Sequence, residues 1–221
     1  MLCTSGLTLE AEVPDAFDVV VGARGELTIA LLSLKSPPPK REEAESALET
    51  VRAAIRSGSP IYDVVSAVRA WTAAGRNRRV ALTLVRFSQP DSRVEILNAG
   101  MPAVACLPPG GRLALHPALS RPIGERFGEV HPYELCPLAW GSTWFLLSEG
   151  ASLGSIEPDA VRTALAHGEL LRQGPELAAS PPAALAPWIE RMTSDAAPIG
   201  DATLVVAHAD PTRRFESGIR S

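Results

Sequence analysis

The chain has 221 residues with 21 basic and 25 acidic side chains, which give a formal net charge of −4. This length supports one large domain or two small ones, and the acidic balance excludes the basic footprint of a nucleic-acid-binding protein. No stretch approaches the ~18 apolar residues that cross a bilayer, and no signal-peptide pattern opens the chain. We therefore expect a cytoplasmic protein that binds neither nucleic acid nor a membrane.

The first half of the chain switches from strand to helix patterns. Two apolar runs, 17–21 and 27–34, flank a glycine-containing turn and predict a hairpin. Apolar residues at helical spacing then predict one helix from residue 41 to the glycine at 58 and a second that ends near residue 75. For the second helix, Ser59 is the expected N-cap and Pro60 the first-turn proline.

The second half is rich in short strands. The expected strands cover residues 80–87, 93–97, 103–107, 144–147 and 202–208, and the segment 129–138 is at best an edge strand because two prolines interrupt it. Helices are expected at 159–167 and 185–192, with a polar linker at 173–182 between them. The run 144–147 is apolar on both faces and ends in Ser148, Glu149 and Gly150, so a buried strand delivers a carboxylate to its end.

This order of elements predicts an α+β fold in which antiparallel sheets are covered by helices. We expect a single domain over residues 14–208, preceded by a lead-in at 1–13 and followed by a flexible tail at 209–221.

Several short motifs occur in the order typical of a known family. They are Pro14–Asp18, Asn98–Pro102, Arg121–Gly124, Gly141–Gly150 and Gly200–Val206. Together they resemble the "G-D-x-x-D", "N-A-G-H-P", "P-L-G", "T-D-G" and "D-D-x-T" elements of the metal-dependent protein phosphatase (PPM) superfamily, in its bacterial SpoIIE-like branch. In the second motif the turn residues are Asn98 and Gly100, and Met101 stands where that family has histidine.

The resemblance implies a four-layer αββα sandwich, with two mainly antiparallel sheets flanked by helices. It also implies a pair of Mg²⁺ or Mn²⁺ ions that activate water for hydrolysis of phosphoserine or phosphothreonine, chemistry that needs hard oxygen ligands. Carried over residue by residue, the first ligand position becomes Ser33, next to Lys35 and a proline-rich turn. The second becomes Glu149, and the third becomes Gly200, followed by Asp201.

These substitutions predict a metal site that has decayed, with no residue that we assign as catalytic. Glu149 and Asp201 are the residual candidate ligands, and Asp15 and Asp18 are further candidates for holding a cation. Each also has a structural interpretation. Glu149 can be a strand-end acid bonded to turn amides, Asp201 a loop acid before a strand, and Asp15 and Asp18 side chains that cap a turn.

Three hypotheses about function follow. The first is a pseudophosphatase that binds no metal cofactor and acts as a regulatory binding module in bacterial signalling, with a phosphorylated partner of the anti-sigma-factor-antagonist kind or a sensor or kinase. The second is an active Mn²⁺- or Mg²⁺-dependent phosphatase with a rearranged site. The third is a structural protein that shares only the fold, because fold alone does not determine function.

Overall fold

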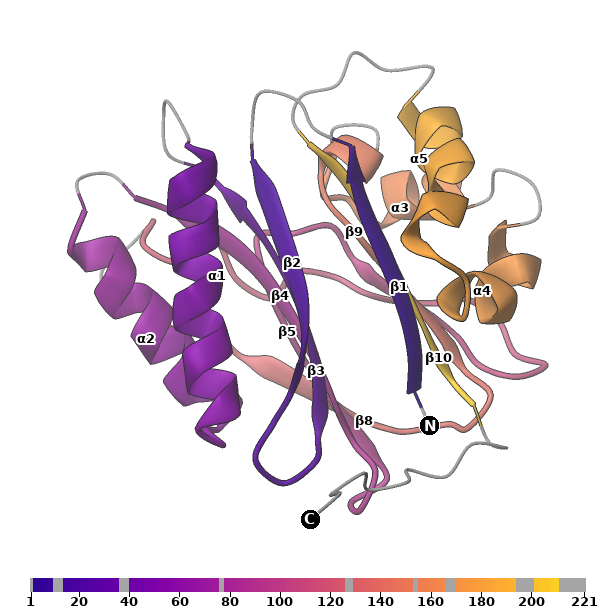
Figure 1. The fold of residues 1–221 in the computed structure, drawn as a ribbon, viewed down its shortest axis with the longest axis horizontal. Coiled ribbons are helices and arrows are strands. Elements are labelled where there is room, and N and C mark those ends of the chain that lie inside the picture. Colours follow the sequence, from indigo (N-terminus) through magenta and orange to yellow (C-terminus); the bar gives the residue numbers. More distant parts are fainter. Residues whose placement is uncertain are drawn as a thin grey trace.

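The protein is a sandwich of two β-sheets with helices on both outer faces, as the four layers in Figure 1 show. The computed structural model describes residues 2–9, 14–35, 40–75, 78–125, 129–152, 155–165, 170–193 and 201–210. The α+β fold and the αββα layering expected from the sequence are confirmed.

Each sheet has five strands, and all of the strand pairs are antiparallel. Sheet A contains, in spatial order, β1 (Leu2–Leu9), β10 (Ala202–Ala209), β9 (Thr143–Leu147), β6 (Val104–Leu107) and β7 (Ala114–His116). Sheet B contains β2 (Asp15–Val21), β3 (Leu27–Leu34), β4 (Val80–Ser88), β5 (Arg93–Ala99) and β8 (Tyr133–Pro137). The prediction that the proline-interrupted segment forms an edge strand is correct, since β8 ends sheet B.

The helices divide between the two outer faces. Sheet B is covered by α1 (Arg41–Arg56) and α2 (Ile61–Ala73), and sheet A by α3 (Pro158–Leu165), α4 (Leu170–Ala178) and α5 (Ala186–Thr193) with the short 3₁₀ turns η1 (Gly150–Ser152) and η2 (Pro182–Leu185). Among the described residues, none of these helices has the length and apolarity that a membrane crossing needs.

Side chains alternate along the strands and build three apolar layers. In β4, Val80, Leu82 and Leu84 pack against α1 and α2, whereas Ala81 and Val85 pack between the two sheets. Strand β4 is buried on both faces over its whole length, and apolar residues therefore occupy both of its faces; Thr83, Arg86 and Ser88 are its buried polar residues. A third layer lies between sheet A and the helices that cover it.

Several elements differ from the sequence-based expectations. Residues 2–9, treated as a lead-in to the domain, form β1 and pair along the full length of β10. Part of the expected linker at 173–182 is helix α4, because Leu170 and Leu177 reach the core on one helix face. The N-cap of α2 is Pro60 rather than Ser59, and no side chain caps this helix. The expected tail lies outside the described residues from position 211, while Ala209 completes β10.

The turn after β5 is held by the side chain of Asn98. Its amide donates to the Pro102 carbonyl at 2.8 Å, and its carbonyl accepts the Met101 N–H at 3.1 Å. Gly100 has a φ of +72°, and a Cβ there would lie 2.6 Å from the ring of Pro122. Glycine is therefore required at this position by both backbone conformation and space.

We expect Gly100→Ala to lower the free energy of unfolding by more than Gly110→Ala does. Gly110 also has a positive φ, of +66°, but a Cβ there would meet nothing within 4 Å. The control variant therefore carries only the left-handed backbone cost of roughly 1–2 kcal/mol. Chemical denaturation measures the free energy of unfolding of both variants. Equal losses in the two variants would show that Pro122 shifts without cost to accommodate the added methyl group.

Candidate functional site

Four strand ends meet at one end of the sandwich, between the two sheets. Asp15 opens β2 and lies opposite Ser33 near the end of β3. In sheet A, Ser148 directly follows β9 and Asp201 directly precedes β10. The antiparallel register therefore gathers hydroxyl and carboxyl groups from distant parts of the chain at a single place.

These groups form a buried hydrogen-bonded cluster, which we call the polar cluster: Asp15, Ser33, Ser148, Asp201 and Thr203. The backbone N–H of Asp15 donates to the Asp201 carboxylate at 3.1 Å, and the Thr203 hydroxyl donates to the Asp15 carboxylate at 3.1 Å. The Ser148 hydroxyl donates to the Asp201 carbonyl at 2.9 Å. The two carboxyl groups thus share one network that joins both sheets.

Burial raises the pKa of the Asp15 carboxyl from 3.8 to about 6. Hydrogen bonds from Ser148 and Ser33 act in the opposite direction, and the nearby charge of Asp201 adds to the rise. Asp15 is 4% exposed, so desolvation of its charged form dominates. The group therefore takes up a proton at mildly acidic pH.

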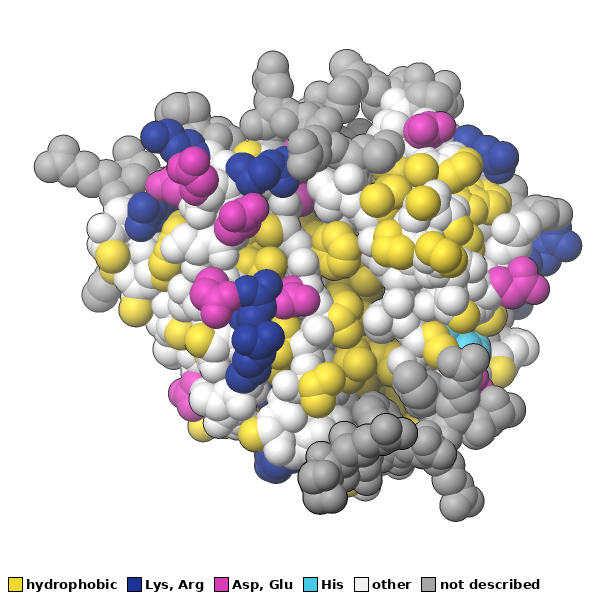
Figure 2. All heavy atoms as spheres, in the orientation of Figure 1, with side chains coloured by type: hydrophobic (Ala, Val, Ile, Leu, Met, Phe, Trp, Pro, Cys, Tyr) yellow, Lys and Arg dark blue, Asp and Glu magenta, His cyan; other side chains and the backbone are white. Residues whose placement is uncertain are grey.

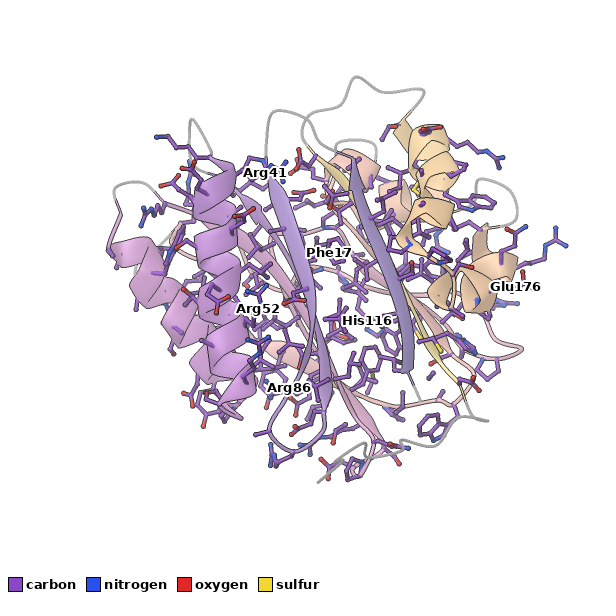
Figure 3. All side chains as sticks on the ribbon, in the orientation of Figure 1. Phe17, Arg41, Arg52, Arg86, His116 and Glu176 are labelled. Carbon is purple, nitrogen blue, oxygen red and sulfur yellow. The ribbon has the colours of Figure 1, made fainter. Side chains whose placement is uncertain are left out.

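Two ion pairs flank the polar cluster, and each supplies a cation to an acidic candidate residue. The Arg41 guanidinium at the start of α1 binds the Asp201 carboxylate at 2.7 Å, and the Asp201 side chain is fully buried. The Lys35 ammonium, just past the end of β3, binds the Glu149 carboxylate. The Glu149 carboxylate therefore has a lysine as its partner. Figure 3 labels Arg41 at this end of the molecule.

Other candidate residues lie elsewhere. Asp18 is on the opposite face of sheet B from Asp15, where its carboxylate accepts a hydrogen bond from Arg52 of α1 at 2.5 Å. The turn residues Asn98, Gly100 and Met101 shape the β5–β6 connection, and Met101 is buried between the sheets. Gly150 begins the turn η1, and Gly200 lies outside the described residues.

The sequence singles out Asp15 and Asp201 as candidate ligands and Ser33 as a substituted ligand position, and all three lie in the polar cluster. The sequence did not point to Arg41, Ser148 or Thr203, which lie in or beside the same cluster. Arg41 appeared only as the first residue of a helix, and the two hydroxyl residues appeared as ordinary strand positions. The threonine of the "D-D-x-T" motif was the one available signal, because its spacing of two residues from Asp201 places Thr203 on the same strand face.

The side chains gathered here fit a pair of divalent metals poorly. Hard cations need several oxygen ligands that carry negative charge. Here Ser33 is neutral, and Asp201 and Glu149 are each bound by a basic side chain. In the described part of the chain, no three His, Cys, Asp or Glu residues are grouped so that they could hold a metal ion.

The stability of the protein should fall as pH rises from about 4 to 6 through the effect of Asp15. Its pKa is raised in the folded state, so the folded protein holds this proton over the window in which the unfolded chain loses it. We expect Asp15→Asn to remove this dependence, which amounts to up to about 3 kcal/mol. Denaturation of both proteins across pH 4 to 7 measures it, and parallel stability curves would contradict the assignment.

No protein-family profile and no curated protein sequence matches this chain. Solved structures do match it. The RsbU and RsbW domains of Rv1364c from Mycobacterium tuberculosis superpose with a TM-score of 0.71 at 13% identity, over 95% of this chain and 60% of that one. The chain therefore spans less than two thirds of that protein.

Two further solved structures are also similar to this chain over most of its length at low sequence identity. The PP2C phosphatase domain of SpoIIE from Bacillus subtilis, with a fragment of its regulatory domain, has a TM-score of 0.72 at 15% identity, over 95% of this chain and 63% of that one. The SiaA PP2C domain of Pseudomonas aeruginosa has a TM-score of 0.70 at 16% identity, over 93% of this chain and 86% of that one. The chain has the fold of the PPM phosphatase domains, as its resemblance to the SpoIIE-like branch predicted.

Proposed function

We propose that this protein is a pseudophosphatase, a PPM-fold domain that acts by binding a protein partner in bacterial signalling. The observation that carries the proposal is the pair of ion pairs at the strand ends, Arg41–Asp201 and Lys35–Glu149. They place two fixed positive charges beside the carboxylates that a phosphatase of this fold would use for metals.

The positive charges of Lys35 and Arg41 oppose metal binding at this site. A divalent ion that enters this site must either lie beside Lys35 and Arg41, where like charges repel, or displace them from their carboxylates. Displacement of Arg41 would remove the cation bound to the fully buried carboxylate of Asp201. Breaking a buried pair in this way is costly because it leaves an uncompensated charge. The protein's own cations thus take the place of metal charge.

The binding role is supported by the retained fold and by the proteins that share it. One similar structure joins RsbU and RsbW domains, and another contains part of a regulatory domain. We infer a partner of the partner-switching type for this chain, either a phosphorylated protein of the anti-sigma-factor-antagonist kind or a sensor or kinase.

One observation favours an alternative, an active phosphatase with a rearranged Mn²⁺ or Mg²⁺ site. Asp15 and Asp201 lie in direct contact, and Glu149 is close to the same end of the sandwich. If the two basic side chains moved aside, three acidic groups would remain there. The ion pairs make this arrangement the less favourable one.

We expect Mn²⁺ and Mg²⁺ to leave the melting temperature of the wild-type protein unchanged up to millimolar concentration. A ligand that binds the folded state must raise that temperature, so the measurement reports binding directly. Hydrolysis of a phosphoserine peptide, followed by phosphate release, should also stay at the background rate. Micromolar metal binding that Glu149→Ala abolishes would instead support the active phosphatase.

We expect Arg41→Ala to lower the free energy of unfolding by about 1–3 kcal/mol, because it leaves the Asp201 carboxylate buried without this partner. The value lies below that of a fully buried pair, since the Arg41 side chain is 40% exposed. The double variant Arg41→Ala/Asp201→Asn should recover much of the loss, as a double-mutant cycle measures. Additive losses would show that the pair contributes nothing.

A further inference from the structure

Within the described residues, one side of the sandwich, here called the open side, has no further strand beyond the edge strand of either sheet. Strand β1 ends sheet A and strand β2 ends sheet B, and the two lie next to each other. Figure 2 shows an apolar strip along this side, flanked on α1 by charged side chains. Unpaired strand edges invite pairing with another chain unless they are covered.

A groove of about 700 Å³ runs along this side, between α1 and the edge strands. Its lining includes Thr8 of β1, Phe17 of β2, and Arg41, Glu42, Glu45 and Glu49 of α1. One end of the groove therefore reaches Arg41 and the polar cluster, and β2 contributes Asp15, Ala16 and Phe17 to its lining.

The backbone of β2 presents alternate residues to the groove. Gly22, just past the strand, donates its N–H to the Glu26 carbonyl across the hairpin. Since pairing alternates along an antiparallel strand, the even positions of β2 bond to β3 and the odd positions point outward. The outward N–H of Asp15 bonds to Asp201, in agreement with this pattern. Phe17, Val19 and Val21 thus point their backbone groups toward the open side, where the Val19 N–H donates to the Asp18 carboxylate at 2.7 Å.

The two walls of the groove differ in chemistry. On the α1 side, Glu42 and Glu45 are exposed, and within the described part of the chain neither forms an ion pair. Arg52 is already bound by Asp18 and Glu49. On the side between the sheets, Phe17 and Val19 belong to the apolar layer. The α1 wall therefore presents the exposed carboxylates of Glu42 and Glu45, and Phe17 is the large apolar side chain of the opposite wall.

We propose that this groove binds an extended segment of a protein partner that adds as a strand to β2 and alternates basic and apolar residues. Successive side chains of a strand point to opposite faces, so one set would meet the acidic wall of α1 and the other set Phe17 and Val19. Main-chain hydrogen bonds to β2 would give affinity, and the alternation would give specificity.

A second copy of this chain fits the groove less well. Pairing of two β2 strands about a two-fold axis would bring the acidic α1 walls of both copies toward each other, with Asp18 near the centre of each strand. Like charges at such distances repel. Charge complementarity therefore selects a basic segment.

The inference deepens the proposed function, because it names the kind of segment that the binding module takes. It concerns Glu42, Glu45 and the edge of β2, whereas the loss of metal binding concerns Lys35 and Arg41. If the peptide does not bind, the loss of metal binding can still be tested separately, and if metal does bind, the groove can still be tested with the Glu42 and Glu45 variants.

The test uses three synthetic eight-residue peptides and fluorescence anisotropy. The first alternates lysine and valine, the second has the same sequence with N-methyl groups on alternate residues, and the third replaces lysine by glutamate. We expect the first to bind and the other two to fail, since N-methylation removes strand pairing and glutamate reverses the charge.

Two protein variants complete the test. Glu42→Lys/Glu45→Lys should weaken binding of the first peptide by roughly tenfold or more. Glu176→Lys, a single charge reversal on α4, which covers the far face of sheet A, should leave it unchanged; Figure 3 labels Glu176 away from the groove. The proposal would be overturned if the first peptide did not bind, or if the N-methylated peptide bound as tightly as the first. It would also be overturned if Glu176→Lys weakened binding as much as Glu42→Lys/Glu45→Lys. Dimerisation that blocks the peptide would favour the second copy instead.

Discussion

A carboxylate that is buried without a compensating positive charge is among the costliest groups a protein can hold, and the buried Asp201 carboxylate avoids this cost by pairing with Arg41. Its side chain is fully buried where β10 begins, and Arg41 reaches it from the first residue of α1. This one ion pair joins the helix layer over sheet B to a strand of sheet A. Together with the Lys35–Glu149 pair, it links the two sheets electrostatically at the end of the sandwich that holds the polar cluster.

The same pairing links the two functional inferences. Under the proposed function, Arg41 and Lys35 supply at the strand ends the positive charge that metal ions supply in a phosphatase. Arg41 also forms the end of the groove along β2. The groove is therefore built from a helix whose position the Arg41–Asp201 pair stabilises, and its acidic residues lie on the next turns of that helix.

Much of the fold could be predicted because local patterns dominate it. Periodicity and turn residues predict the largely apolar strand β4, the hairpin of β2 and β3, and the two amphipathic helices α1 and α2. The predictions that failed concern β1 and α4. The edge strand β1 mixes serine, threonine and glycine with apolar residues, and α4 contains Pro175, so local signals in both are weak and pairing or packing decides.

The sequence by itself determined the α+β class and the order of most elements, and it predicted Ser33 at the first ligand position. It could not decide which acids meet which bases. Lys35 and Glu149 are 114 positions apart and Arg41 and Asp201 are 160 apart. Asp15 and Asp18 look alike in sequence, yet strand alternation sends one between the sheets and the other toward α1. Only the register of the sheets and the packing of α1 bring these charges together, because Coulomb interactions depend on distance in space rather than along the chain.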